Sequence, residues 1–254
     1  MLDLNSKRWA EFASTVNLKM ASFLRFLDTN PTENLIRERF DDFISIYDDL
    51  THQQTTWIDA TASMPHLLMI ASRLPLEIRC EFWRYCGYLH RDGAWQSPDH
   101  ELNAAYSDSV KSAKMEMLSC ANECPLTPDS EFSVAFALSA MSDNDFATEF
   151  VDYDTIFEFE CAHCHTQFEG EQADMKIVFG KKLSSVATPK EMPYFIVPPA
   201  DVTNFELRVG QENLAWLCQL IESTRLPYVK RWLSGRLGDF QCPNCGNQSW
   251  AVPI

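Results

Sequence analysis

The fold of the second half of this chain is decided by two short stretches, FECAHCHTQFEG at residues 159–170 and FQCPNCGNQSW at residues 240–250. Each stretch holds two cysteines three positions apart, and in the second one a proline and a glycine favour a tight turn. Two thiolates at this spacing can bind one metal ion, and two such turns supply the four sulfurs of a tetrahedral shell. The spacing therefore predicts a metal site made of Cys161, Cys164, Cys242 and Cys245.

The residues around these turns predict a small α+β domain over residues 151–254. TIFEFEC at residues 155–161 alternates in the period of a β-strand, and DMKIVFG and NFELRVG are similarly short and β-rich. Ahead of the second cysteine pair, ENLAWLCQLIES and YVKRWLSGRL have the apolar spacing of two short helices.

Together the two cysteine turns, CAHC and CPNCG, resemble a zinc ribbon over residues 155–254. The resemblance implies that the four cysteines bind a structural zinc ion, because a shell of four thiolates has no open position for water or substrate. The chain departs from the usual spacing of about 15 to 20 residues between the pairs, since 77 residues separate Cys164 from Cys242. Insertion of the two helices into the ribbon explains this gap.

Other interpretations of the cysteines stay open at this point. The four sulfurs could bind iron in a rubredoxin-like site, form transient disulfides or pack in the core, and His163 or His165 could replace one ligand. The remaining cysteines lie on predicted helices, where we expect them to pack as small apolar residues: Cys80, Cys86, Cys120, Cys124 and Cys218.

The first 150 residues predict an all-helical domain, because their apolar residues recur at spacings of three and four. We expect one helix over residues 9–27 and a second from about Glu33 to Tyr47. Pro65 and Pro75 each fit the first turn of a further helix, where the missing N–H is no loss.

Two more helices are expected to begin after the capping residues Ser97 and Ser142, with EFSVAFALSAM forming another between them. Each helix is amphipathic and must be covered by its neighbours, which favours a layered, HEAT-like array. The predicted fold class is thus mainly α: a helical array over residues 1–150, joined to a zinc-ribbon α+β domain with an inserted helical pair over residues 151–254.

The charge of the chain points to its class of partner. The formal net charge is -15, and residues 1–150 carry 23 acidic against 12 basic side chains. An acidic surface repels nucleic acid and anionic membranes, and it favours a basic protein partner. The acidic cluster predicted to bind this partner lies around one helix end and consists of Asp41, Asp42, Asp48 and Asp49. The alternative is that these carboxylates only form a solvated face.

The sequence also bears on location and catalysis. The N-terminus has no apolar segment after a basic start, and no stretch approaches eighteen consecutive apolar residues, so we expect a soluble, cytoplasmic protein that does not bind membranes. No catalytic motif is recognisable from spacing, and we therefore expect that the chain is not an enzyme. The alternative enzyme would have a site between the two domains, lined by His90, Asp92 and His100.

A helical array followed by a cysteine ribbon is similar to a group of bacterial proteins, some of which resemble immunity proteins of secreted polymorphic toxins. This resemblance implies a non-catalytic protein that binds a cognate toxin, such as an ADP-ribosyltransferase or a nuclease, and blocks its active cleft. The alternative in another class is a zinc-ribbon protein that acts in transcription or on nucleic acid, and the acidic charge counts against it.

Overall fold

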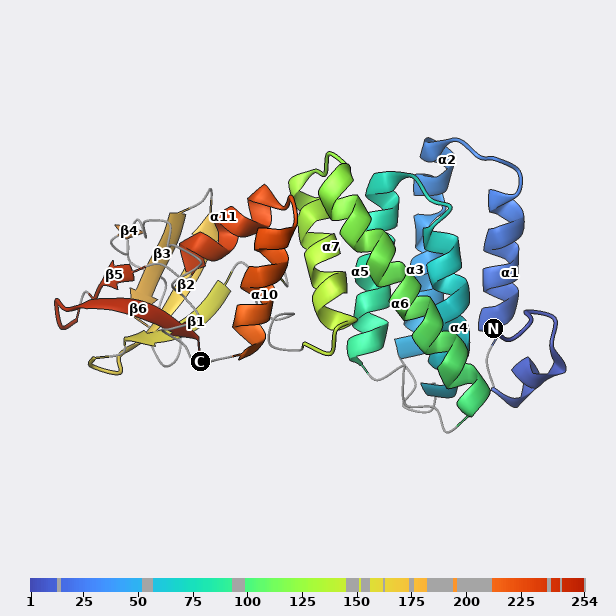
Figure 1. Cartoon of the computed structure of the whole chain (residues 1–254), viewed down its shortest axis with the longest axis horizontal. Helices are drawn as coiled ribbons and strands as arrows, with labels where there is room; N and C mark the ends of the chain where they lie inside the picture. Colours follow the sequence, from blue (N-terminus) through green and yellow to red (C-terminus); the bar gives the residue numbers. More distant parts are fainter. Residues whose placement is uncertain are drawn as a thin grey trace. The chain divides into compact units, whose positions relative to one another are not determined.

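The computed structural model of the chain describes residues 1–12, 15–51, 57–92, 99–144, 151, 156–161, 163–173, 176–181, 194–195, 212–236, 239–242 and 244–253. The chain divides into two compact units, Met1–Thr148 and Glu149–Ile254 (Figure 1). This division lies close to the boundary expected near residue 151. None of the helices in the described part of the chain combines the length and the apolarity needed to cross a bilayer.

The N-terminal unit is helical throughout its described residues, as the apolar spacing predicts. Its elements are a short 3-10 helix, η1 (Lys7–Glu11), and the helices α1 (Val16–Leu27), α2 (Glu33–Glu38), α3 (Phe40–Thr51), α4 (Trp57–Ala71), α5 (Leu76–Arg91), α6 (His100–Glu123) and α7 (Pro128–Ala140).

Two of the predicted helices are interrupted. The helix expected over residues 9–27 consists of η1 and α1, because the backbone at Phe12 leaves helical geometry (φ -96°, ψ 55°) and α1 begins only at Val16. The second expected helix is divided into α2 and α3 at Arg39 (φ -102°, ψ 9°). Apolar spacing continues across both breaks, so periodicity alone does not reveal them.

Two predicted helix starts are wrong. Pro65 lies inside α4 and not in its first turn. An interior proline normally breaks a helix, but α4 is held by its neighbours, since residues 59–68 are all buried. Helix α6 is capped by Asp99 instead of Ser97: its carboxylate accepts hydrogen bonds from the N–H groups of Glu101 and Leu102. The helix expected over residues 143–151 after Ser142 falls mostly on residues 145–150, outside the described residues, and Asp143 at its start has a left-handed backbone (φ 54°).

In this unit, helices α4 and α5 lie in contact with each other and with most of the remaining helices. Helix α5 contacts α3 and α7, and α4 contacts α1, α5 and α6. Phe43 and Phe82 are buried and stack between α3 and α5 with ring centroids 3.4 Å apart. Where α5 meets α7, a Cβ atom on Gly87 would lie 3.1 Å from the Cα atom of Ala137. Only glycine allows the two backbones to approach so closely.

The C-terminal unit combines a sheet with two helices, as the change of sequence period predicts. Its described elements are β1 (Ile156–Cys161), β2 (Gln167–Ala173), β3 (Lys176–Lys181), β4 (Tyr194–Phe195), α10 (Glu212–Ser223), α11 (Pro227–Arg236), β5 (Asp239–Gln241) and β6 (Gln248–Pro253). The helical pair expected between the cysteine pairs is present as α10 and α11. The strand expected in NFELRVG lies outside the described residues.

The described strands form one antiparallel sheet in the order β4-β3-β2-β1-β6-β5. Strands β1 and β6 are far apart in sequence but pair directly, with Cys161 opposite Ala251. Strand β1 runs into the first cysteine turn, and β5 and β6 flank the second. The pairing of β1 with β6 therefore brings the two cysteine turns together.

Candidate metal centre and acidic surface

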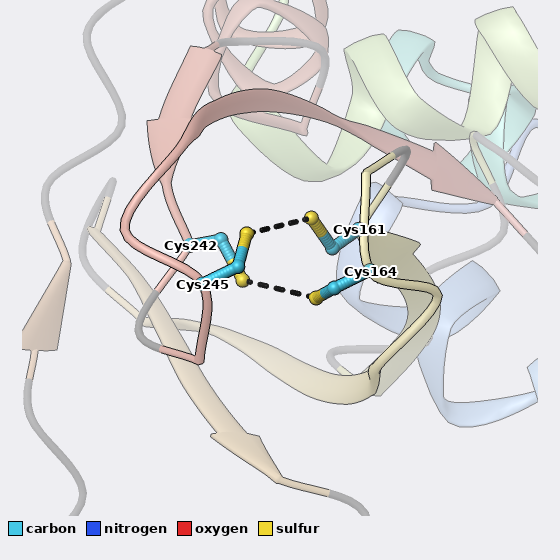
Figure 2. Close-up of side chains that lie close together, drawn as sticks. All are labelled: Cys161, Cys164, Cys242 and Cys245. Atoms are coloured by element: carbon cyan, nitrogen blue, oxygen red, sulfur yellow. Dashed lines mark hydrogen bonds between the residues drawn. The ribbon is translucent and has the colours of Figure 1, made fainter.

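The four cysteines predicted to bind a metal converge, as Figure 2 shows. The Sγ atoms of Cys161 and Cys245 lie 3.9 Å apart, those of Cys164 and Cys242 lie 3.7 Å apart, and all four lie within 4.8 Å of one another. None of these four cysteines forms a disulfide bond. Sulfurs on a tetrahedron about 2.3 Å from a central ion are about 3.8 Å apart. The four sulfurs are thus close enough to hold a single metal ion.

The two turns that carry these cysteines have the same backbone hydrogen bonds. In each turn the first cysteine donates its N–H to the carbonyl five residues later, and the N–H four residues later donates back to its carbonyl. These bonds are Cys161 N to Thr166 O (3.1 Å), His165 N to Cys161 O (2.9 Å), Cys242 N to Asn247 O (2.9 Å) and Gly246 N to Cys242 O (2.8 Å). Separate stretches of sequence therefore build two equivalent halves of the site.

Both turns also require a left-handed backbone at their fifth position. Gly246 has φ 73°, a conformation that glycine adopts without strain. The equivalent residue of the first turn is His165, with φ 54°. A side chain in this region is unfavourable by about 1–2 kcal/mol, so the first turn is more strained than the second.

Two polar residues that the sequence did not single out connect the turns beside Cys164. The Nδ2 atom of Asn244 donates to Thr166 Oγ1 (2.9 Å) and lies 3.7 Å from Cys164 Sγ. Thr166 Oγ1 is in turn 3.2 Å from the same sulfur. Their positions in the sequence are the feature that could have indicated them: Thr166 lies five residues after Cys161, and Asn244 lies two residues after Cys242.

These contacts make the thiols of one sulfur pair unequal. Hydrogen bonds from Thr166, and then from Asn244, lower the pKa of Cys164. Burial raises the pKa of Cys242, whose sulfur lies across the site. Of these two thiols, the half-buried Cys164 therefore ionises more readily than the buried Cys242.

The two histidines in the first turn do not join the four sulfurs. His163 is exposed, and its Nε2 atom lies 3.0 Å from the carbonyl oxygen of Gln248. His165 is also exposed. Within the described part of the chain, the group of side chains arranged to hold a metal contains the four cysteines and no histidine.

The acidic residues predicted to bind a partner all lie on α3, but the prediction that they lie around one helix end is wrong, since Asp41 and Asp42 are in its first turn and Asp48 and Asp49 near its last residue. They also divide into two kinds. Asp42 accepts a hydrogen bond from Arg39 Nε (2.6 Å), and Asp49 lies 2.6 Å from Lys19 Nζ. Asp41 and Asp48 are exposed, and among the described residues neither forms an ion pair. Half of the predicted cluster is therefore neutralised within the unit, and half is available to an external cation.

The residues of the alternative enzyme site do not come together. His90 is buried, with Nε2 3.0 Å from Asp143 Oδ1 and Nδ1 2.6 Å from the hydroxyl of Tyr106. Asp92 caps the end of α5 and is exposed, and His100 is exposed at the start of α6. Among the described residues no side-chain hydrogen bond joins the three, and His90 serves to fix α5 to α6 and to the turn after α7.

Comparison with known proteins adds no relative to this description. No protein-family model, curated protein or solved structure matches the chain. The candidate site therefore has to be interpreted from its own geometry and charge.

Proposed function

We propose that the four cysteines bind one structural zinc ion, and that the C-terminal unit is a zinc ribbon with α10 and α11 inserted. The sulfur separations of 3.7 Å and 3.9 Å fit tetrahedral zinc. The two hairpin-like turns at the ends of β1 and β5 support the ribbon interpretation. Because four thiolates fill the shell, the ion would have no position at which to activate water.

We propose further that the chain is a non-catalytic binding protein that neutralises a basic protein partner, most simply the catalytic domain of a cognate toxin. Because such a shell is closed, the metal would stabilise the fold and would not take part in catalysis. The observation that carries the proposal is the charge of the helical unit: residues 1–150 have 11 more acidic than basic side chains. Toxins that act on nucleotides or nucleic acid need basic clefts, which an acidic array complements.

The test uses the protein encoded beside this chain in its genome. Cells expressing a toxic domain from that neighbour should survive when this chain is co-expressed, and the two purified proteins should form a complex. Electrostatic steering acts on encounter, so raising the salt concentration from about 0.05 M to 0.5 M should lower the association rate about tenfold or more, with little change in dissociation.

Two results would reject the proposal. One is the absence of both rescue and complex formation with basic neighbours. The other is tight binding to DNA or RNA with a salt dependence of several phosphates, which would favour the nucleic-acid alternative. Substituting Cys164→Ser provides the control for metal, because a purely structural site leaves the acidic helical surface intact.

A further inference from the structure

Helices α3 and α5 share a row of half-buried aromatic rings. The ring centroid of Tyr85 lies 5.1 Å from that of Tyr47, 5.7 Å from that of Phe43 and 6.1 Å from that of Phe40. Phe43 is fully buried beneath this row, whereas Tyr47 and Tyr85 are both partly exposed. The two tyrosines therefore present rigid aromatic surface to solvent above a packed core.

Each of the two helices also supplies a carboxylate close enough to act on Tyr85. Glu81 on α5 and Asp48 on α3 both act electrostatically on its phenol, and both are exposed. Within the described residues neither carboxylate takes part in an ion pair, in contrast to Asp42 and Asp49 on the same helix as Asp48. Burial raises the pKa of Glu81 and Arg37 and Arg84 only partly offset it, so a further cation beside Glu81 would stabilise its carboxylate form.

A neighbouring tyrosine, Tyr88, differs from Tyr47 and Tyr85 because arginine side chains lie over its ring. Tyr88, one turn further along α5, has the guanidinium of Arg91 5.0 Å from its ring centroid and that of Arg84 at 5.6 Å. Arg84 also faces Tyr85, but it hydrogen-bonds to the hydroxyl of Tyr88. In the described part of the chain, no lysine or arginine stacks on Tyr47 or Tyr85. Arg37 and Arg84 do act electrostatically on Glu81, but among the described residues neither forms an ion pair with it.

We propose that Tyr47, Asp48, Glu81 and Tyr85, here called the Tyr85 site, bind a lysine or arginine side chain of a basic protein partner. The inference rests on the proposed function and names its surface. A cation over the ring of Tyr85 gains a cation–π interaction and is attracted by the carboxylates of Glu81 and Asp48. Exposed tyrosines at the centre of a patch also anchor protein interfaces. The occupant is basic protein because unpaired carboxylates repel phosphates and acidic peptides.

The test uses a blocked hexa-arginine peptide as the probe and the full-length protein. The double variant Asp48→Asn, Glu81→Gln should weaken peptide binding about tenfold. The matched control is Asp108→Asn, Glu123→Gln, which removes the same charge from two exposed residues of α6 and should change affinity less than about twofold. Calorimetry at two salt concentrations measures both, and thermal unfolding checks that each variant is folded.

Substitutions of the ring separate cation–π binding from charge alone. Tyr85→Phe keeps the ring and should bind the peptide as tightly as the native protein, whereas Tyr85→Leu should weaken binding about threefold. Arginine chemical shifts of the bound peptide should move upfield in the native protein and in Tyr85→Phe, and not in Tyr85→Leu. Equal losses for the two double variants would overturn the Tyr85 site, since only net charge would then matter.

Other occupants would also overturn the inference. Binding of a hexa-glutamate peptide at this face, or self-association of the chain that the Asp48→Asn, Glu81→Gln variant abolishes, would each assign the surface to a different partner. None of these results bears on toxin rescue, so the Tyr85 site can be disproved without contradicting the proposed function. Loss of rescue with intact peptide binding would reject the proposed function instead.

Discussion

The four cysteines of the metal centre lie in turns between strands, whereas Cys80, Cys86 and Cys120 lie on helices α5 and α6 and are buried in the N-terminal unit. The helical thiols also approach one another: Cys80 hydrogen-bonds to Cys120, which bonds to Cys124 at the end of α6. Among the described residues, however, only the four turn cysteines have the geometry to hold a metal. The difference lies in the backbone, since a turn can aim two thiols at one point.

This contrast extends to what holds each unit together. The helical unit has a continuous apolar core that includes Phe23, Phe43, Phe82 and Trp83, all of them almost completely buried. In the C-terminal unit, the buried residues that the structure describes lie mainly on α10 and α11. We infer that packing stabilises the first unit and that the metal contributes much of the stability of the second.

Removing the metal should have the largest effect and should act on the C-terminal unit alone. Structural zinc contributes about 10–16 kcal/mol of apparent binding free energy. We expect one zinc ion per chain by elemental analysis, and loss of C-terminal amide-exchange protection on chelation or in Cys242→Ser. Protection in α4 and α5 should persist.

The control for this experiment is Cys86→Ser, which alters a buried helical thiol instead. Protein purified without chelator that contains no stoichiometric metal would contradict the prediction. So would an exchange pattern in Cys242→Ser that matches the native one over β1 and β6.

A substitution in the helical core should instead destabilise the N-terminal unit and leave the C-terminal unit unchanged. Phe43→Ala removes a ring that stacks on Phe82 in a site with no exposure, and it should destabilise the helical unit by about 3–5 kcal/mol. Chemical denaturation monitored by far-ultraviolet circular dichroism measures the loss. The zinc content should remain one per chain, and a loss of metal in this variant would show that the two units are not energetically separate.

The pH dependence of the helical unit provides a smaller effect. Burial lowers the pKa of His66, whose Nε2 atom lies 2.6 Å from the carbonyl of Leu2 and whose Nδ1 atom is buried without a partner in the described structure. The unfolded chain takes up this proton below about pH 6.5 and the folded chain resists it. Stability should therefore fall as the pH drops through this window.

His66→Gln keeps a donor for Leu2 and should flatten the dependence, whereas His100→Gln, which changes an exposed histidine, should not. Urea titrations followed by amide exchange in α4 at pH 7.5 and pH 5.5 distinguish the two. An unchanged slope in His66→Gln would assign the pH dependence to other groups.

The two cysteine turns allow the finest comparison. His165→Gly should relieve the left-handed residue of the first turn, and Gly246→Ala should strain its equivalent, where a Cβ atom meets nothing within 4 Å. Each effect should be about 1 kcal/mol, with opposite signs, which is about fivefold in apparent zinc affinity. Competition with a chromogenic chelator measures both, and changes of the same sign would contradict the equivalence of the turns.

The convergence of the four cysteines was predictable because metal-binding chemistry restricts residue type and spacing together. Four thiolates in two pairs are recognisable in the sequence even with a long insertion between them. The helices were predictable for a related reason, since a buried face imposes its period on the residues that form it. The bounds of α10, for example, coincide with the predicted stretch.

The features that sequence did not reveal depend on contacts between distant residues. In sequence, Pro65 is typical of the start of a helix. It lies inside α4 instead, and the burial of residues 59–68 against neighbouring helices stabilises this arrangement. Ser97 and Asp99 are both acceptable caps, and Arg8 contacts the one that is used. Likewise, Asn244 and Thr166 are unremarkable in sequence until the two turns meet.

The pairing of β1 with β6 has a consequence for synthesis. Cys245 follows Cys161 by 84 residues, so a ribosome adding about 5–20 residues per second completes the second turn roughly 4–17 seconds after the first. The helical unit can fold in that interval, because its contacts are complete. During the same interval, the first turn has only the thiols of Cys161 and Cys164, which are half of the four proposed ligands. Metal binding at the proposed site would therefore be a late event, which could occur only after the last strand is made.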